Sequence, residues 1–213
     1  NRSDREIERR VRLMTVDERL AVLSAFEGDR GNRRHRPGRA LERPSYRFDV
    51  LSDYGAFRDL QRHRMLTLDW QRLSAAHGFV RPPEVDDAGL SDRFDAAMER
   101  SRGLHDALEP AFPDQAPYAV SLAYRVRYMM HMNAREAMHV IELRTTPQGH
   151  ASYREVCQQM HNLIADEAGH HAIAAMMSFV DHSSAPELER LESERRSEQK
   201  RTKRLNRPDS STA

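Results

Sequence analysis

The stretch LAYRVRYMMHM, residues 122–132, repeats with a period of two residues. One set of positions is mainly apolar or aromatic and comprises Leu122, Tyr124, Val126, Tyr128, Met130 and Met132, while the alternate set comprises Ala123, Arg125, Arg127, Met129 and His131. Successive side chains of a β-strand point to opposite faces, whereas a helix repeats every 3.6 residues. The pattern therefore predicts a strand with one buried face, and the rest of the chain must supply its neighbours.

A second strand is predicted at residues 45–51, SYRFDVL, where Tyr46, Phe48 and Val50 alternate with polar residues. Helical patterns separate and follow these two strands. Because strands are interspersed with helices, we predict an α+β fold in which an antiparallel sheet packs with helices.

Pairs of residues that cap helices predict where several helices begin. Ser3 with Glu6 and Thr15 with Glu18 form capping boxes, and Gly28 ends the second helix. Asn133 with Glu136 opens a helix that runs to about Arg144.

The remaining elements follow from apolar spacing and from breakers. We predict a helix capped by Ser52, a helix over 91–108 and a long helix from Ser152 to about Val180. Residues 65–73 fit a helix or a strand, residues 78–92 resemble a loop, and residues 187–207 are dense in charge.

Three regions divide the chain. Residues 1–44 hold two helices and an arginine-rich connector, residues 45–182 form the main domain, and residues 183–213 form a charged helical or disordered tail. The connector, residues 28–44, contains arginines at positions 30, 33, 34, 36, 39 and 43. It fits either a contact with a polyanion or a solvated link.

Composition limits the class of protein. The 213 residues are 38% hydrophobic and 31% charged, and no apolar run reaches the ~20 residues of a membrane span. We expect no membrane or nucleic-acid partner and no signal peptide at the charged N-terminus. The chain starts at Asn1, as expected of a processed chain or a part of a longer one. The single Cys157 excludes an internal disulfide and favours a reducing, cytoplasmic setting and a buried thiol.

Two Glu-x-x-His units, Glu136 to His139 and Glu167 to His170, are of the kind that di-iron carboxylate bundles repeat. In a helical hairpin that turns near Pro147, the two units would be displaced from each other by more than ~10 Å along the helix axes, too far to share a di-metal centre. A di-metal carboxylate protein is therefore a remote alternative, and we assign no metal ligand.

Two polar segments are better candidates for chemistry. Arg62, His63 and Arg64 follow a helix, and a later strand–helix unit presents Asn133, Ala134 and Arg135 followed by His139 and Arg144. Such residues suit a surface that binds an anion, although the same spacing also fits a solvent-facing helix.

Two segments together resemble the two motifs of the flavin-dependent thymidylate synthases, both in their order and in their separation along the chain. They are FDVLSDYGAFRDLQRHR (48–64) and NAREAMHVIELR (133–144). The resemblance covers about residues 45–180. It implies an enzyme that methylates C5 of dUMP or a related uridine nucleotide in dTMP biosynthesis. The cofactor would be FAD, with NADPH and methylenetetrahydrofolate as co-substrates, and the assembly a homotetramer or a pair with a second copy.

The same resemblance implies roles for individual residues. FAD would contact Arg62, His63, Arg64, Asn133, Ala134, Arg135 and His139. The nucleotide would contact Arg62, Thr67 and Arg144. Arg72, which holds no family position, is a further candidate that would replace a lost phosphate contact. Arg144 would be the catalytic residue, since its positive charge would stabilise the anion that develops on the uracil.

This chain departs from the family pattern mainly on the nucleotide side. Trp70 stands where the family has a carboxylate, and Ser74 and Pro117 stand where it has arginines. Asp59 replaces a glutamine, and residues 151–154 read ASYR where the family has Ala-Gln-x-Glu. The alternative function is therefore a non-catalytic or half-site homologue that acts in assembly with an active copy.

Overall fold

A three-stranded antiparallel sheet lies at the centre of the computed structural model, which describes residues 2–184, 194–196, 198–199 and 202. The strands are β1 (Ser45–Asp53), β2 (Thr67–Trp70) and β3 (Arg125–Asn133), in the order β1-β3-β2. Both strand predictions are confirmed, and β2 resolves the ambiguous stretch 65–73. The period-two stretch forms the central strand, although β3 begins at Arg125 rather than at Leu122.

The sheet has one buried and one exposed face, as the alternation predicts. Phe48 lies opposite Met130, and Val50 lies opposite Tyr128, with all four side chains buried. On the other face the Arg127 guanidinium pairs with the exposed carboxylate of Asp49 on the neighbouring strand.

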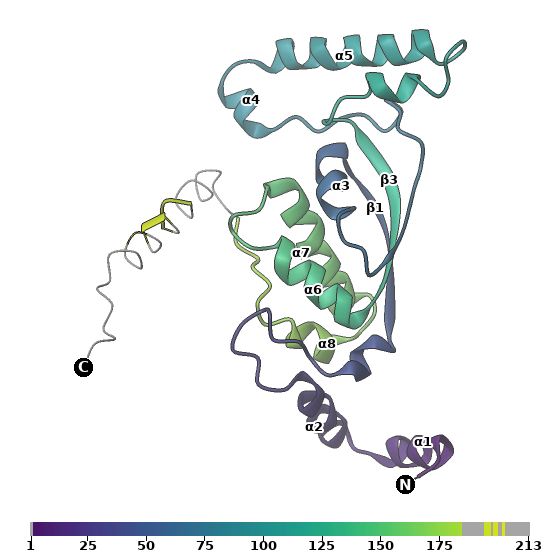
Figure 1. Cartoon of the computed structure of the whole chain (residues 1–213), viewed down its shortest axis with the longest axis vertical. Coiled ribbons are helices and arrows are strands. Elements are labelled where there is room, and N and C mark those ends of the chain that lie inside the picture. The colour runs from purple at the N-terminus through teal and green to yellow at the C-terminus, as the bar shows by residue number, and fades with distance from the viewer. Residues whose placement is uncertain (1, 185–193, 197, 200–201, 203–213) are drawn as a thin grey trace, which may run out of the picture.

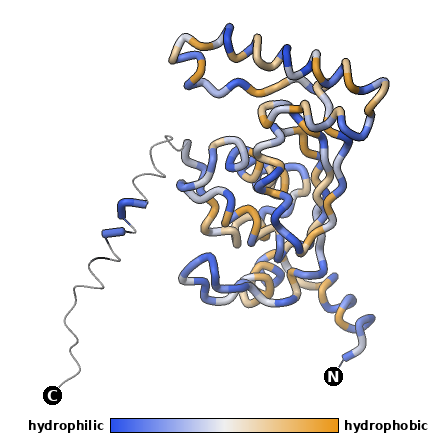
Figure 2. The backbone as a smooth tube through the Cα atoms, turned by 45° about the horizontal axis from the view of Figure 1, so that its top comes forward, coloured by the Kyte–Doolittle hydropathy of each residue, from blue (hydrophilic) through white to orange (hydrophobic). Residues whose placement is uncertain are grey.

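Helices α3 (Tyr54–Leu60), α6 (Ala134–Arg144) and α7 (Ala151–Asp166) pack on the buried side of the sheet (Figure 1). Short α8 (His171–Met176) packs against α7. Hydrophobic and hydrophilic stretches are interspersed along the chain (Figure 2), and buried and exposed residues alternate along β1 and β3. Helices packed on one face of such a sheet make an α+β fold. The predicted fold class is confirmed.

Cys157 lies in this core on α7 and is fully buried, as predicted. Burial in apolar surroundings raises the pKa of its thiol to about 12. The thiol is therefore protonated near neutral pH and is not a nucleophile.

The N-terminal helices α1 (Asp4–Leu13) and α2 (Val16–Glu27) form with both predicted capping boxes. Gly28 ends α2 with a φ of 67°, a left-handed conformation that glycine adopts without steric cost. Neither helix has a buried residue, and α1 lies at the edge of the molecule (Figure 1). After them, the short 3₁₀ turn η1 (Arg39–Glu42) precedes β1.

At the opposite end of the sheet, α5 (Ser91–Leu108) spans the predicted range, and η2 (Ala116–Ala119) packs on it. A small cluster of Ala75, Met98, Val120 and Tyr124 holds this end together. The predicted loop 78–92 contains a short helix, α4 (Pro83–Asp87). Pro83 favours it because proline suits the first turn of a helix.

Two predicted helix starts were wrong. Asp53, not Ser52, caps α3 by accepting a hydrogen bond from the Ala56 amide. Ser52 belongs to β1, and its hydroxyl lies 2.9 Å from that of Tyr128. His150, rather than Ser152, caps α7, since the Ser152 hydroxyl binds the Asp53 carboxylate instead.

The single long helix predicted from Ser152 to Val180 was also wrong. The chain ends α7 at Asp166, passes through Gly169 with a φ of 65° and starts again as α8. Most of the predicted tail, 183–213, lies outside the described residues. Within the described part of the chain, none of the helices combines the length and apolarity needed to cross a membrane.

Candidate functional site

The Arg62-His63-Arg64 segment lies in the turn that follows α3. Phe57 and Leu60 on α3 are buried, so they fix the direction in which the chain leaves the helix. The His63 side chain is only 6% exposed, whereas Arg62 is 67% exposed and forms an ion pair with Asp59. Arg64 is exposed as well. The turn therefore points one imidazole inward and leaves two guanidinium groups towards solvent.

The second segment is held by the start of α6. The Asn133 side chain accepts a hydrogen bond from the Glu136 amide, which starts the helix where β3 ends. Glu136 and His139 are three residues apart and therefore neighbours on the helix surface. Arg144 is the last residue of α6.

The structure brings the two segments together through His63 and Arg144. The Arg144 Nε donates to Nε2 of His63 over 2.9 Å, and its Nη2 donates to the Asp59 carbonyl over 2.6 Å. The guanidinium also lies 5.3 Å from the centre of the Tyr153 ring. These contacts fix an arginine that is only 16% exposed.

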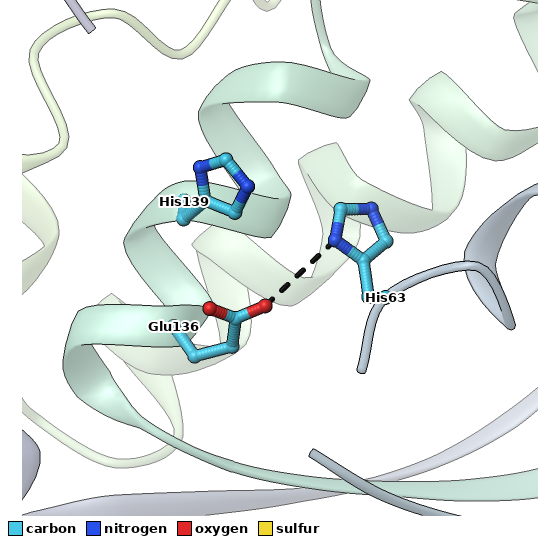
Figure 3. A group of neighbouring side chains, drawn as sticks. All are labelled: His63, Glu136 and His139. Atoms are coloured by element: carbon cyan, nitrogen blue, oxygen red, sulfur yellow. Dashed lines mark ion pairs between the residues drawn. The ribbon is translucent and has the colours of Figure 1, made fainter. Parts of the chain in front are cut away.

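His63 also faces α6 with its other nitrogen. Its Nδ1 lies 3.8 Å from Oε1 of Glu136, and its ring centre lies 5.8 Å from that of His139 (Figure 3). Because Glu136 and His139 come from one helix and His63 from the turn after α3, the group joins two segments that are distant in sequence.

The surroundings of His139 are cationic. Burial lowers the pKa of His139, the nearby Arg33 and Arg36 lower it further, and the charge of Glu136 opposes them. Arg33 and Arg36 belong to the arginine-rich connector. Since both act on His139, the connector adds positive charge to this site.

His63, Glu136 and His139 each offer one ligand atom, and these atoms lie within 4.8 Å of one another, close enough to consider a metal ion. Two features oppose a cation. Arg144 occupies Nε2 of His63 as a donor, which leaves the proton on Nδ1, the atom that would have to bind the metal. The positive charges of the nearby arginines also disfavour the binding of a metal cation. The site suits an anion better than a metal.

The second Glu-x-x-His unit lies apart from the first. Neither Glu167 nor His170 belongs to the group around His63 within the part of the chain that the structure describes. Instead, Nδ1 of His170 lies 2.9 Å from the Tyr46 hydroxyl. The structure does not assemble the two units into a di-metal centre.

Other predicted cofactor residues have contacts within the protein. Arg135 donates to the Pro37 carbonyl over 3.1 Å and pairs with Glu42 over 2.7 Å, so it binds the connector to α6. Ala134 is fully buried, and its amide donates to the Pro44 carbonyl.

The predicted nucleotide residues outside the two motifs lie elsewhere. Thr67 begins β2, opposite His131. Arg72 pairs with Glu109, just after α5, over 3.1 Å. Trp70, at the end of β2, packs its ring 5.7 Å from that of Phe57. Of the predicted nucleotide residues, Arg144 is the one whose contacts reach His63.

Three residues make contacts that the sequence did not predict: Glu136 and Asp59 at the site, and Arg30 away from it. Glu136 was noted as a cap and as a possible metal ligand, and its spacing to His139 was the signal available. Asp59 contributes a backbone carbonyl, which no side-chain pattern reveals. Arg30 is buried against Glu142, and the only signal was an acidic residue within an apolar stretch of α6.

Comparison with known proteins places the chain among relatives. The family model described as thymidylate synthase complementing protein matches residues 30–170. The chain is 37% identical to UPF0159 proteins of Chlamydia muridarum and Chlamydia pneumoniae, over 83% and 87% of its length and 33% and 34% of theirs. It is 36% identical to a UPF0159 protein of Thermoplasma acidophilum, over 87% of this chain and 37% of that protein. It thus spans about a third of the length of these relatives.

Proposed function

The chain belongs to the thymidylate synthase complementing protein family, and from this premise we propose that it is a flavin-dependent thymidylate synthase-like protein. The reaction would convert dUMP, methylenetetrahydrofolate and NADPH with a proton into dTMP, tetrahydrofolate and NADP⁺. The observation that supports it best is the hydrogen bond between His63 and Arg144, which joins the two motifs that sequence alone suggested.

The residues present fit a flavin. Its diphosphate is an anion, and arginine binds phosphate oxygens with two parallel donors. Arg62 and Arg64 are exposed beside the inward His63, and Arg33 and Arg36 add charge near His139. FAD, when bound, would supply the hydride that turns the transferred carbon into a methyl group. We propose Arg62, His63, Arg64 and His139 as the residues that hold it.

Arg144 is proposed to bind the uracil. Its Nε and one Nη2 hydrogen are used by His63 and Asp59. Its Nη1 forms an ion pair with the Asp59 carboxylate at 3.7 Å, which is longer than a hydrogen bond, so hydrogens on Nη1 and Nη2 can still be donated to a ligand. A fixed guanidinium with free donors can accept the edge of a uracil and stabilise negative charge that develops on the ring. Its partial burial strengthens that effect, because electrostatic interactions weaken in water.

A half-site protein is the second candidate. Arg72 is engaged with Glu109, Trp70 packs on Phe57, and the chain spans about a third of its relatives. In this alternative the chain retains the flavin side of the site, and another copy or another part of a longer protein supplies the nucleotide side.

Flavin binding tests the proposal directly. Adding FAD to the purified chain should quench flavin fluorescence with saturation, and Arg64→Ala should weaken binding about tenfold or more, the loss expected for one charge-assisted contact. Arg93→Ala, at an exposed position of α5, is the matched control and should bind as the wild type does. The proposal fails if the wild type does not bind FAD, or if Arg64→Ala and Arg93→Ala bind it equally well.

A further inference from the structure

Glu136 has no role in the proposed chemistry, yet its carboxylate is directed at His63. The Glu136 side chain is 14% exposed and that of His63 is 6% exposed, so the two face each other largely away from water. Figure 3 shows the carboxylate of Glu136 and Nδ1 of His63 on opposite sides of the gap between α6 and the turn after α3. The other nitrogen of His63 is held by Arg144.

The contact with Arg144 determines where His63 carries its proton. A guanidinium has only donors, so Nε2 of His63 must present a lone pair to accept the 2.9 Å hydrogen bond. A neutral imidazole has one N–H group, which therefore has to be Nδ1–H. With the proton on Nε2, two N–H groups would face each other, and Arg144 would lose this contact.

Glu136 favours the tautomer that Arg144 needs. Its Oε1 lies 3.8 Å from Nδ1, which is longer than a hydrogen bond but within the range of a strong charge–dipole interaction at a site with little water. A negative charge at this position stabilises a proton on Nδ1.

We propose that Glu136 is a positioning residue, which fixes His63 as the Nδ1–H tautomer and thereby orients Arg144 for its ligand. The chain of contacts runs from Glu136 through His63 to Arg144, with Asp59 holding the far side of the guanidinium. The identity of the ligand as a uracil nucleotide rests on the proposed function, whereas the tautomer does not. Glu136 itself does not touch the substrate.

The tautomer can be measured without any ligand. In uniformly ¹⁵N-labelled protein, long-range ¹H–¹⁵N spectra distinguish protonated from unprotonated ring nitrogens, and His63→Asn identifies the His63 signals by their loss. Wild type should show Nδ1–H for His63. Glu136→Gln keeps the shape but removes the charge, so it should show a mixture with Nε2–H. Glu155→Gln, at an exposed position on α7, should match wild type.

Two spectroscopic results would overturn the inference: a wild type in which His63 carries its proton on Nε2, or an unchanged tautomer in Glu136→Gln. Glu136→Asp guards against a variant that fails to fold, because it keeps the charge at a longer distance and should give a smaller shift towards Nε2–H. An Asp variant with the same spectrum as Glu136→Gln would show that charge is not the cause.

Binding of dUMP provides the functional readout. Glu136→Gln should bind dUMP about tenfold more weakly, because one charge-assisted hydrogen bond is weakened and not removed, and Glu136→Asp should recover part of the loss. Unchanged binding in Glu136→Gln alongside a changed tautomer would overturn the link to Arg144. A wild type that binds FAD but shows no dUMP binding even at millimolar concentration would overturn the assignment of a uracil nucleotide to Arg144, and a wild type that binds neither would overturn the proposed function. In both cases the spectra still decide the role of Glu136.

Discussion

Outside the site, a single residue of the arginine-rich connector, Arg30, anchors this loop to the core of the protein. Arg30 and Glu142 form an ion pair in which the side chains are 3% and 1% exposed. Arg30 also donates to the Met176 carbonyl over 2.9 Å and lies over the Phe179 ring. The sequence suggested either a polyanion contact or a solvated link for this loop. For Arg30 neither interpretation holds, because its charge is buried against α6 and the end of α8.

Removing Arg30 should therefore destabilise the protein strongly. Arg30→Met leaves the Glu142 carboxylate buried without its cation, and such losses cost about 3–5 kcal/mol of unfolding free energy. Arg34→Met, at an exposed position of the same connector, should stay within about 0.5 kcal/mol of wild type. Urea unfolding measures both.

The double variant Arg30→Met/Glu142→Leu distinguishes the effect of an unpaired buried charge from the effect of lost side-chain packing. It should be clearly more stable than Arg30→Met alone, since no unpaired charge remains buried. Equal stability of the single and double variants would mean that Glu142 does not depend on Arg30.

Among the elements, the turn between α6 and α7 connects packing to the site. Gly149 lies in this turn, and a Cβ at that position would come 2.7 Å from Cε2 of Tyr153 and 3.0 Å from the Thr146 carbonyl oxygen. Tyr153 lies beneath the guanidinium of Arg144. A side chain at position 149 would therefore displace Tyr153 and, through it, the guanidinium of Arg144.

Gly149→Ala should lower the unfolding free energy by about 1–3 kcal/mol, the usual range for an overpacked position. The control is Gly103→Ala in the middle of α5, where an added Cβ meets nothing within 4 Å. That variant should gain roughly 0.5–1 kcal/mol, because alanine loses less entropy than glycine in a helix. Thermal unfolding measures both, and equal shifts in the two variants would contradict the steric argument.

Elements with local signals were predicted from the sequence, and those that depend on tertiary contacts were not. The capping box at Thr15 and the side-chain cap at Asn133 are each complete within four residues, so the local sequence is enough to predict them. Ser52 and Asp53 both suit a helix cap, and the choice between them depends on Tyr128, which is 75 or more positions away and binds the Ser52 hydroxyl. The break after α7 depends on Gly169, a residue that helices also tolerate.

On the scale of the whole molecule, the candidate site was predicted as a set of residue types but not as a set of contacts. The motifs at 62–64 and 133–144 pointed to a shared anion site, and the structure joins them through His63 and Arg144. For the connector, which includes Arg33 and Arg36, the sequence left open a polyanion contact or a solvated link, and because arginines occur throughout the chain it did not indicate which of them lie near the site. Only the fold shows which of them lie near His139.

The whole molecule also determines how much activity this chain should have by itself. His63 and His139, which we propose to hold the flavin, lie side by side, whereas the proposed nucleotide side has Trp70, Ser74 and Pro117 where the family that this chain resembles has a carboxylate and two guanidinium groups. Arg72 does not replace them, as it pairs with Glu109. Each charge-assisted hydrogen bond contributes about 1.5–3 kcal/mol, so we expect three missing contacts to weaken nucleotide binding by several orders of magnitude.

We therefore expect the isolated chain to bind FAD but to convert dUMP slowly. The measurement is tritium release from 5-³H-dUMP in the presence of FAD, NADPH and methylenetetrahydrofolate. Adding a family member whose nucleotide motif is intact but whose flavin-binding arginines are substituted should raise the rate, if the two chains share a site. The matched control adds the same partner to the Arg64→Ala variant, which should give no such increase. Fast turnover by the isolated chain at ordinary dUMP concentrations would show that the three missing contacts are dispensable, and the half-site alternative would then be abandoned.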